Sequence, residues 1–115
     1  MSKGQRDIRL FLTDVLKAIQ KIDSYTDKMT YNEFIEDEKT KDAVLRNLEV
    51  IGEAVKNIPD DIKGSYSEID WKGAAGMRDK LIHEYFGVSF LVVWETVKND
   101  LPILKHGIEI ILKEV

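Results

Sequence analysis

The chain has 115 residues, the length of one domain, and we expect a single domain over residues 1–115. Apolar residues make up 43% and charged residues 33%, a balance that excludes a wholly disordered chain. The absence of cysteine excludes disulfides, thiolate nucleophiles and cysteine-ligated zinc or iron–sulfur centres. The net charge of −4 argues against a surface that binds nucleic acid broadly through positive charge, although a local basic cleft on an acidic body stays open.

Neither a membrane span nor a secretion signal is expected. No apolar run approaches ~18 residues, the length that a membrane helix needs. Residues 1–7 lack the apolar core of a signal peptide. We therefore expect a cytoplasmic protein.

Apolar residues at helical spacing predict a first long helix over about residues 6–25. Its apolar stripe consists of Ile8, Phe11, Leu12, Val15, Ile19 and Ile22. Thr30 followed by Glu33 is a capping-box pattern, which predicts a short helix at about 30–36. A second long helix is expected at about 38–57, ended by the proline at position 59.

The segment after this proline predicts a turn at 59–61 and a loop that continues through 64–67. Asp70 is a candidate cap for a third helix over 71–86. Gly87 is expected to end that helix.

A fourth helical stretch is expected from about Ser89. The run 90–94 is β-prone by propensity, but apolar residues at helical spacing continue past it. Asp100, followed two positions later by a proline, predicts either a new helix start or a kink. Four or five amphipathic helices joined by short loops indicate an all-α fold, an up-and-down four-helix bundle with a short extra helix.

The third predicted helix concentrates the reactive side chains. It begins with the four small residues 73–76, which permit another backbone or a ligand to approach closely. Asp79 and His83 are four positions apart and share a helix face, where a carboxylate can fix the tautomer of an imidazole. Arg78 lies about 140° from His83 around an ideal helix but only about 20° from Tyr85. A joint site for the arginine and the histidine therefore needs a helix distortion, a long reach or a second subunit.

These residue types suit the cleavage of a phosphodiester. Histidine moves protons at neutral pH, and arginine offers a fixed fork of donors to a phosphate. RNA carries its own nucleophile, the 2′-hydroxyl, so a base and a phosphate clamp could suffice without a metal. The alternative is a solvated helix face in which Arg78 and Asp79 make ordinary ion pairs and His83 is a boundary residue.

A second polar cluster lies on the second long helix. Arg46, Glu49 and Glu53 follow one another at helical spacing, and Asn47 lies beside them. Two glutamates four positions apart are compatible with a metal site, but no Glu-x-x-His pair accompanies them. Arg46 provides a counter-ion instead, so no metal is predicted.

The segment 76–87, GMRDKLIHEYFG, resembles the Arg-x4-His-x-Tyr motif of HEPN-domain proteins, and in particular the HepT toxin branch. The segment 46–54, RNLEVIGEA, resembles that branch as well, as do Trp94-Glu95 and Asp100-Leu101-Pro102. The resemblance covers nearly the whole chain in order. It implies an up-and-down helical bundle that forms a homodimer, with the two Arg–His motifs facing each other across a cleft.

The resemblance also implies an activity, which is that of a metal-independent ribonuclease toxin without a cofactor. It assigns proton transfer to His83, phosphate binding to Arg78 and a supporting role to Asp79. The expected partner is an MntA-type nucleotidyltransferase antitoxin, which blocks such toxins by transferring AMP to the motif tyrosine, here Tyr85. Arg46, Asn47 and Glu53 then become candidates for lining the cleft or bracing the motif helix.

Two other functions compete with an endoribonuclease acting on RNA. One is a non-catalytic, nucleotide- or partner-binding subunit of a minimal nucleotidyltransferase. The other is a helical dimer without site chemistry. A substitution of His83 discriminates the first function from the other two, because only cleavage requires the imidazole.

Overall fold

The computed structural model describes the backbone of residues 2–83 and 89–115, and the side chains of residues 8–77 and 89–115. Over these ranges the fold is all-α, as the sequence predicted, and contains no strand. The elements in chain order are α1 (Ser2–Thr26), α2 (Tyr31–Glu36), α3 (Glu38–Lys56), α4 (Asp60–Ser65), α5 (Trp71–His83), α6 (Phe90–Glu95), the π-helical segment η2 (Thr96–Asp100) and α7 (Leu101–Glu114).

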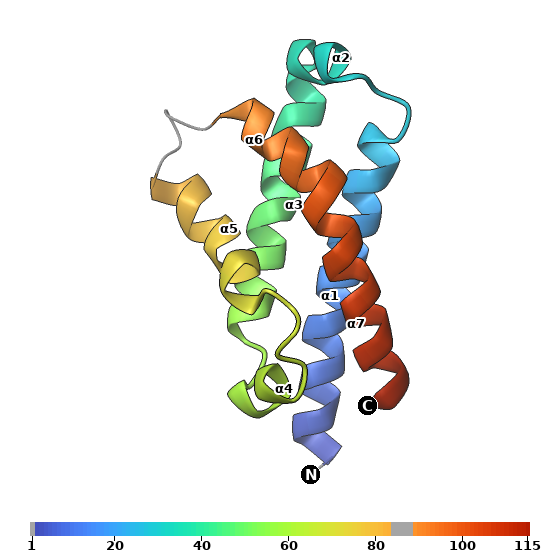
Figure 1. Ribbon diagram of the computed structural model, residues 1–115, viewed down its shortest axis with the longest axis vertical. Helices are drawn as coiled ribbons and strands as arrows, with labels where there is room; N and C mark the ends of the chain where they lie inside the picture. Colours follow the sequence, from blue (N-terminus) through green and yellow to red (C-terminus); the bar gives the residue numbers. More distant parts are fainter. Residues whose placement is uncertain (1, 84–88) are drawn as a thin grey trace.

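The helices form an up-and-down bundle (Figure 1). α3 packs against both α1 and α5, and α1 also packs against α7. The elements α6, η2 and α7 follow one another in a single rod that returns the chain to the end where it began. The short helix α2 lies at one end of the bundle, and α4 lies at the other end, near both termini.

The apolar stripes of the long helices meet in one core. The fully or almost fully buried side chains are Leu12, Val15, Ile19 and Ile22 of α1, Val44, Leu48, Ile51 and Val55 of α3, and Leu101, Leu104, Ile108 and Ile111 of α7. Because each stripe repeats at the helical period, each helix buries one face and exposes the other. The predicted stripe of the first long helix is confirmed, with Ile8 and Phe11 partly buried against the core.

Side-chain caps set the starts of α2 and α3. The hydroxyl of Thr30 accepts from the backbone N–H of Glu33 at 3.2 Å, and the carboxylate of Glu33 accepts from the N–H of Thr30 at 2.9 Å. This is the predicted capping box. Asp37 caps α3 by accepting from the N–H of Thr40 at 3.1 Å, and this hydrogen bond lowers the pKa of the Asp37 carboxyl.

The predicted turn and loop after Pro59 are partly wrong, because residues 60–65 form the helix α4. As predicted, α3 ends shortly before Pro59, but Pro59 also directly precedes α4, with extended backbone angles. Asp60 and Asp61 occupy the first turn and Lys63 the last, which complements the helix dipole at both ends. The first helix also begins earlier than predicted, at Ser2.

The expected break near Asp100 is a π-helical turn rather than a new helix start or a sharp kink. The N–H of Leu101 donates to the carbonyl of Thr96, five residues back, so the helix continues with one wider turn. Pro102 explains the wider turn, because a proline ring collides with the carbonyl four residues before it in a regular α-helix. The β-prone run at 90–94 is helical, as its continuing period predicted.

No helix among the residues described here is long and apolar enough to cross a membrane.

Candidate active site

The motif helix α5 starts at the predicted cap. The carboxylate of Asp70 accepts from the backbone N–H of Gly73 at 2.9 Å. A Cβ atom at position 73 would overlap the Oδ2 atom of Asp70. The glycine therefore makes room for the carboxylate that caps the helix.

The beginning of α5 is also fixed to α7. The buried indole of Trp71 donates through Nε1 to the carbonyl of Tyr66 at 3.0 Å. The hydroxyl of Tyr66 donates to Oε1 of Glu114 at 3.1 Å. Burial and the neighbouring Glu114 carboxylate raise the pKa of Tyr66. Ile69 packs directly on Gly107, where an added Cβ would meet its Cδ1 at 2.7 Å.

These contacts predict how α5 responds to substitution. Asp70→Ala should lower the free energy of unfolding by about 1 kcal/mol, because it removes an N-cap. Gly73→Ala should lower the free energy of unfolding by a similar amount. The new methyl group displaces the Asp70 carboxylate, so the same N-cap is lost. Chemical denaturation of both single variants and of the double variant tests this explanation. Independent, fully additive losses would contradict a shared cause.

The residues predicted for catalysis lie at the end of α5 and beyond it. The backbone of Arg78, Asp79 and His83 is helical, but their side chains lie outside the described residues. Tyr85 and the predicted helix stop Gly87 also lie outside them, as does the last part of the expected 71–86 helix. Since the backbone is helical through His83, Arg78 and His83 keep their separation of about 140° around the axis.

The second predicted cluster lies on α3. Arg46 is exposed, with its Nη1 atom 3.6 Å from Oε2 of Glu49, the counter-ion arrangement that the spacing indicated. Asn47 donates from Nδ2 to the carbonyl of Ala43 at 2.9 Å, and Glu53 is exposed. No group of three or more His, Cys, Asp or Glu residues that could hold a metal occurs in the described part of the chain.

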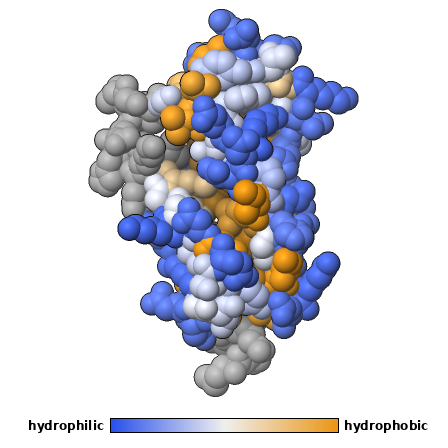
Figure 2. All heavy atoms as spheres, in the orientation of Figure 1, coloured by the Kyte–Doolittle hydropathy of each residue, from blue (hydrophilic) through white to orange (hydrophobic). Residues whose placement is uncertain are grey.

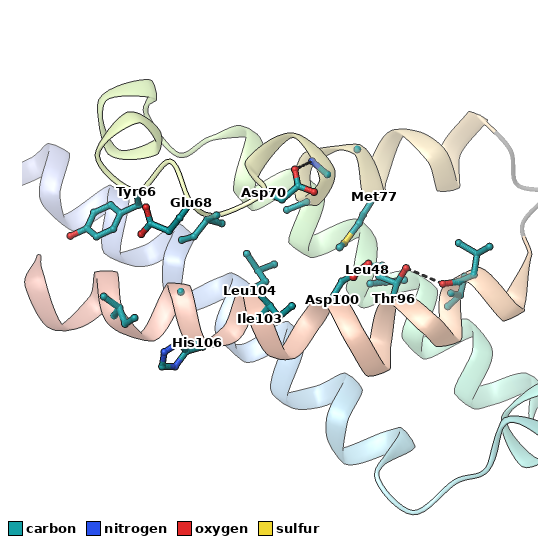
Figure 3. A pocket seen from close by; sticks show the side chains of 18 of the residues that line it. Leu48, Tyr66, Glu68, Asp70, Met77, Thr96, Asp100, Ile103, Leu104 and His106 are labelled. Atoms are coloured by element: carbon teal, nitrogen blue, oxygen red, sulfur yellow. Dashed lines mark hydrogen bonds between the residues drawn. The ribbon is translucent and has the colours of Figure 1, made fainter.

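A groove of about 780 Å³ adjoins the motif helix. It lies between α5 on one side and α6, η2 and α7 on the other, and Leu48 of α3 contributes to its lining (Figure 3). Figure 2 shows hydrophobic side chains around a hollow in the middle of this face. Gly73, Ala74 and Gly76 line the groove, so the small residues at the start of the helix do open a space beside it.

The sequence did not indicate the polar residues of this groove. Thr96 and Asp100 enter it from η2, and Figure 3 shows both pointing toward Met77 of α5. Glu68 and Asp70 line it from the segment before α5. His106 contributes to the lining as well, although its exposed imidazole points away from α5. Among the lining residues that the structure describes there is no lysine or arginine. Arg46, Asn47 and Glu53 do not line it either.

Comparison with known proteins identifies one family. A family model described as "Ribonuclease HepT-like" matches residues 15–111. The chain is 52% identical over 111 residues to "Putative RNase MJ1216" of Methanocaldococcus jannaschii, covering 96% of this chain and 92% of the relative. It is 48% identical over 109 residues to "Probable ribonuclease HepT" of Thermococcus cleftensis, covering 95% and 96%. No solved structure matches the chain.

Proposed function

Because the chain belongs to the ribonuclease HepT-like family, we propose that it is an endoribonuclease whose site is the Arg78–His83 motif of α5. The observation that carries this proposal is the match to relatives named as ribonucleases over nearly the full length of the chain. The segment that holds the arginine and the histidine is helical, which supports the motif geometry. The capped start of α5 adds to that support.

The proposed reaction uses the RNA itself as nucleophile. The 2′-oxygen attacks the adjacent phosphorus, the bond from phosphorus to the 5′-oxygen breaks, and the products are a 2′,3′-cyclic phosphate and a 5′-hydroxyl. His83 transfers the proton from the 2′-hydroxyl toward the leaving 5′-oxygen. Arg78 binds the phosphate oxygens as their charge grows in the transition state. Asp79, four residues before His83 on the same helix, orients the imidazole. This reaction requires no metal and no cofactor.

The protein acts as a homodimer in this proposal. Arg78 and His83 lie about 140° apart around α5, and two facing copies bring an arginine and a histidine together without a bend in the helix or a long reach of the arginine. In this proposal the contact between copies leaves the groove of the candidate active site open. Leu91 of α6 is 49% exposed and does not line that groove, so it is available for such a contact.

The biological setting that we propose is a toxin–antitoxin pair. The antitoxin is an MntA-type nucleotidyltransferase that transfers AMP to Tyr85. The added phosphate would place a negative charge seven residues after Arg78 and compete with RNA for that arginine. This proposal derives from the resemblance of the motif to the HepT branch.

Expression in cells without an antitoxin tests the proposed activity. The wild type should stop growth and degrade RNA, whereas Arg78→Ala and His83→Ala should do neither although both accumulate as folded protein. RNA integrity and circular dichroism are the readouts. If all three proteins are folded and harmless, the chain is a binding subunit of a nucleotidyltransferase instead.

A further inference from the structure

We propose that the groove between α5 and η2–α7 is a nucleobase subsite of the ribonuclease, in which Asp100 binds the hydrogen-bond donors of a guanine. This inference rests on the proposed function, because it names the part of the RNA that the groove accepts. The groove lies directly beside the motif helix. Met77 lines the groove, and the next residue of the same helix is Arg78, the proposed phosphate ligand. Because Arg78 directly follows Met77, its backbone lies beside the wall of the groove, and we place the base in the groove and its phosphate at the motif.

The shape and the walls of the groove suit an unstacked base. Its volume of about 780 Å³ lies within the range of pockets that hold small organic ligands. Its walls include the apolar side chains of Leu48, Ile69, Met77, Val93 and Leu104. Single-stranded RNA is recognised by splaying a base onto apolar or aromatic surface and by hydrogen-bonding its edge.

The polar atoms of the groove are mainly acceptors. The hydroxyl of Thr96 donates to the carbonyl of Val92 at 2.9 Å, so its oxygen can only accept a further hydrogen bond from a ligand. Asp70 uses Oδ1 to cap α5, and a carboxylate has no donor of its own. Asp100 adds a carboxylate whose side chain makes no capping hydrogen bond to α7. A ligand of this groove must therefore supply donors.

The π-helical turn explains why the two residues act together. Thr96 and Asp100 are four positions apart, and one π turn closes after slightly more than four residues, so both side chains leave the helix on the same side. Figure 3 shows them side by side, opposite Met77. Such turns inside α-helices are frequent at functional sites.

The negative charge of the groove lining favours a neutral base over a phosphate of the RNA. Three carboxylates line the groove, those of Glu68, Asp70 and Asp100, and no lysine or arginine is among the described lining residues. A phosphate is repelled by this arrangement, whereas a neutral base is not. Guanine fits best, because its N1–H and its exocyclic N2 amine are parallel donors that match the two oxygens of one carboxylate. Uracil offers a single donor between two carbonyl acceptors.

Cleavage of matched oligonucleotides tests the subsite. The substrates differ only in the nucleotide beside the scissile bond, which is guanosine, inosine, adenosine, cytidine or uridine. The wild type should prefer guanosine, and inosine, which lacks the N2 amine, should lose most of that preference. Asp100→Asn should reduce the ratio of guanosine to uridine cleavage by roughly tenfold to a hundredfold, the range for a bidentate contact to a base. Asp14→Asn, at an exposed position of α1 away from the groove, should keep the wild-type ratio.

The contradicting results are distinct from a failure of the proposed function. An Asp100→Asn protein with the wild-type base preference overturns the subsite while cleavage stands. If Asp100→Asn changes the mass of the dimer but not the base preference, the subsite is also overturned. In that case a second copy of the chain covers the groove. If the wild type cuts no RNA at all, titration of guanosine, inosine and uridine followed by NMR decides the subsite alone. Equal binding of the three nucleosides, or no binding, overturns it.

Discussion

Coexpressed Arg78→Ala and His83→Ala chains should cleave RNA together although neither variant cleaves it alone. The reason is the angle of about 140° between the two positions on α5, which assigns each phosphate to the arginine of one copy and the histidine of the other. In a mixed dimer one of the two sites then holds both native residues. Random pairing gives about one quarter of the wild-type rate, because half of the dimers are mixed and each has one intact site. The measurement is the cleavage rate of the copurified proteins.

Two controls decide this experiment. A chain that carries both substitutions, coexpressed with either single variant, should restore nothing. Leu91→Lys places a charge on an exposed apolar side chain of α6 that does not line the groove, and it should convert the dimer to a monomer that does not cleave. No recovery in dimers shown by mass to be mixed would mean that each chain builds its site alone, by a bend in α5 or by the reach of the arginine.

AMP attached to Tyr85 should abolish cleavage. The added group is bulky and negatively charged, so it occupies the space of the substrate phosphate and neutralises Arg78. We expect the modified protein to lose at least about a hundredfold in rate, comparable to removing a general acid–base catalyst. Cleavage rates of the modified and unmodified proteins, with the modification verified by mass spectrometry, give the result.

The matched variant is Tyr85→Phe, which lacks only the hydroxyl that accepts the AMP. It should cleave RNA at close to the wild-type rate and should no longer be blocked when the nucleotidyltransferase and ATP are supplied. If the modified wild type cleaves as fast as the unmodified protein, inhibition does not act through the motif. If Tyr85→Phe is itself inactive, the tyrosine belongs to the reaction and is more than an attachment point.

Local signals in the sequence were sufficient for most of the fold. The apolar stripe of α1 and the capping box at Thr30 depend on residues three or four positions apart, so their pattern is visible in a single sequence. The helix α4 was missed because Pro59 was interpreted as the start of a loop, although a proline that precedes two aspartates also suits a helix start. The π-helical turn was missed because its cause, Pro102, indicates a disturbance without specifying its form.

The residues of the candidate site also fall into two groups, those that the sequence predicted and those that only the structure reveals. Arg78 and His83 come from a contiguous motif, so the sequence predicted them although their side chains lie outside the described residues. Asp100 and Thr96 face the motif helix only because η2 lies across the groove from α5, and no spacing in the sequence relates positions 77 and 100. A groove that forms between helices distant in the chain requires the tertiary arrangement.

Metal-independent cleavage by this protein is tested most directly with a labelled RNA and the purified protein in the presence of EDTA. The wild type should cleave and leave 2′,3′-cyclic phosphate and 5′-hydroxyl ends. His83→Ala, with an unchanged circular dichroism spectrum and dimer mass, should be slower by about a hundredfold to ten-thousandfold. Cleavage by His83→Ala at the wild-type rate, or loss of wild-type cleavage on chelation, would contradict a metal-independent reaction centred on this histidine.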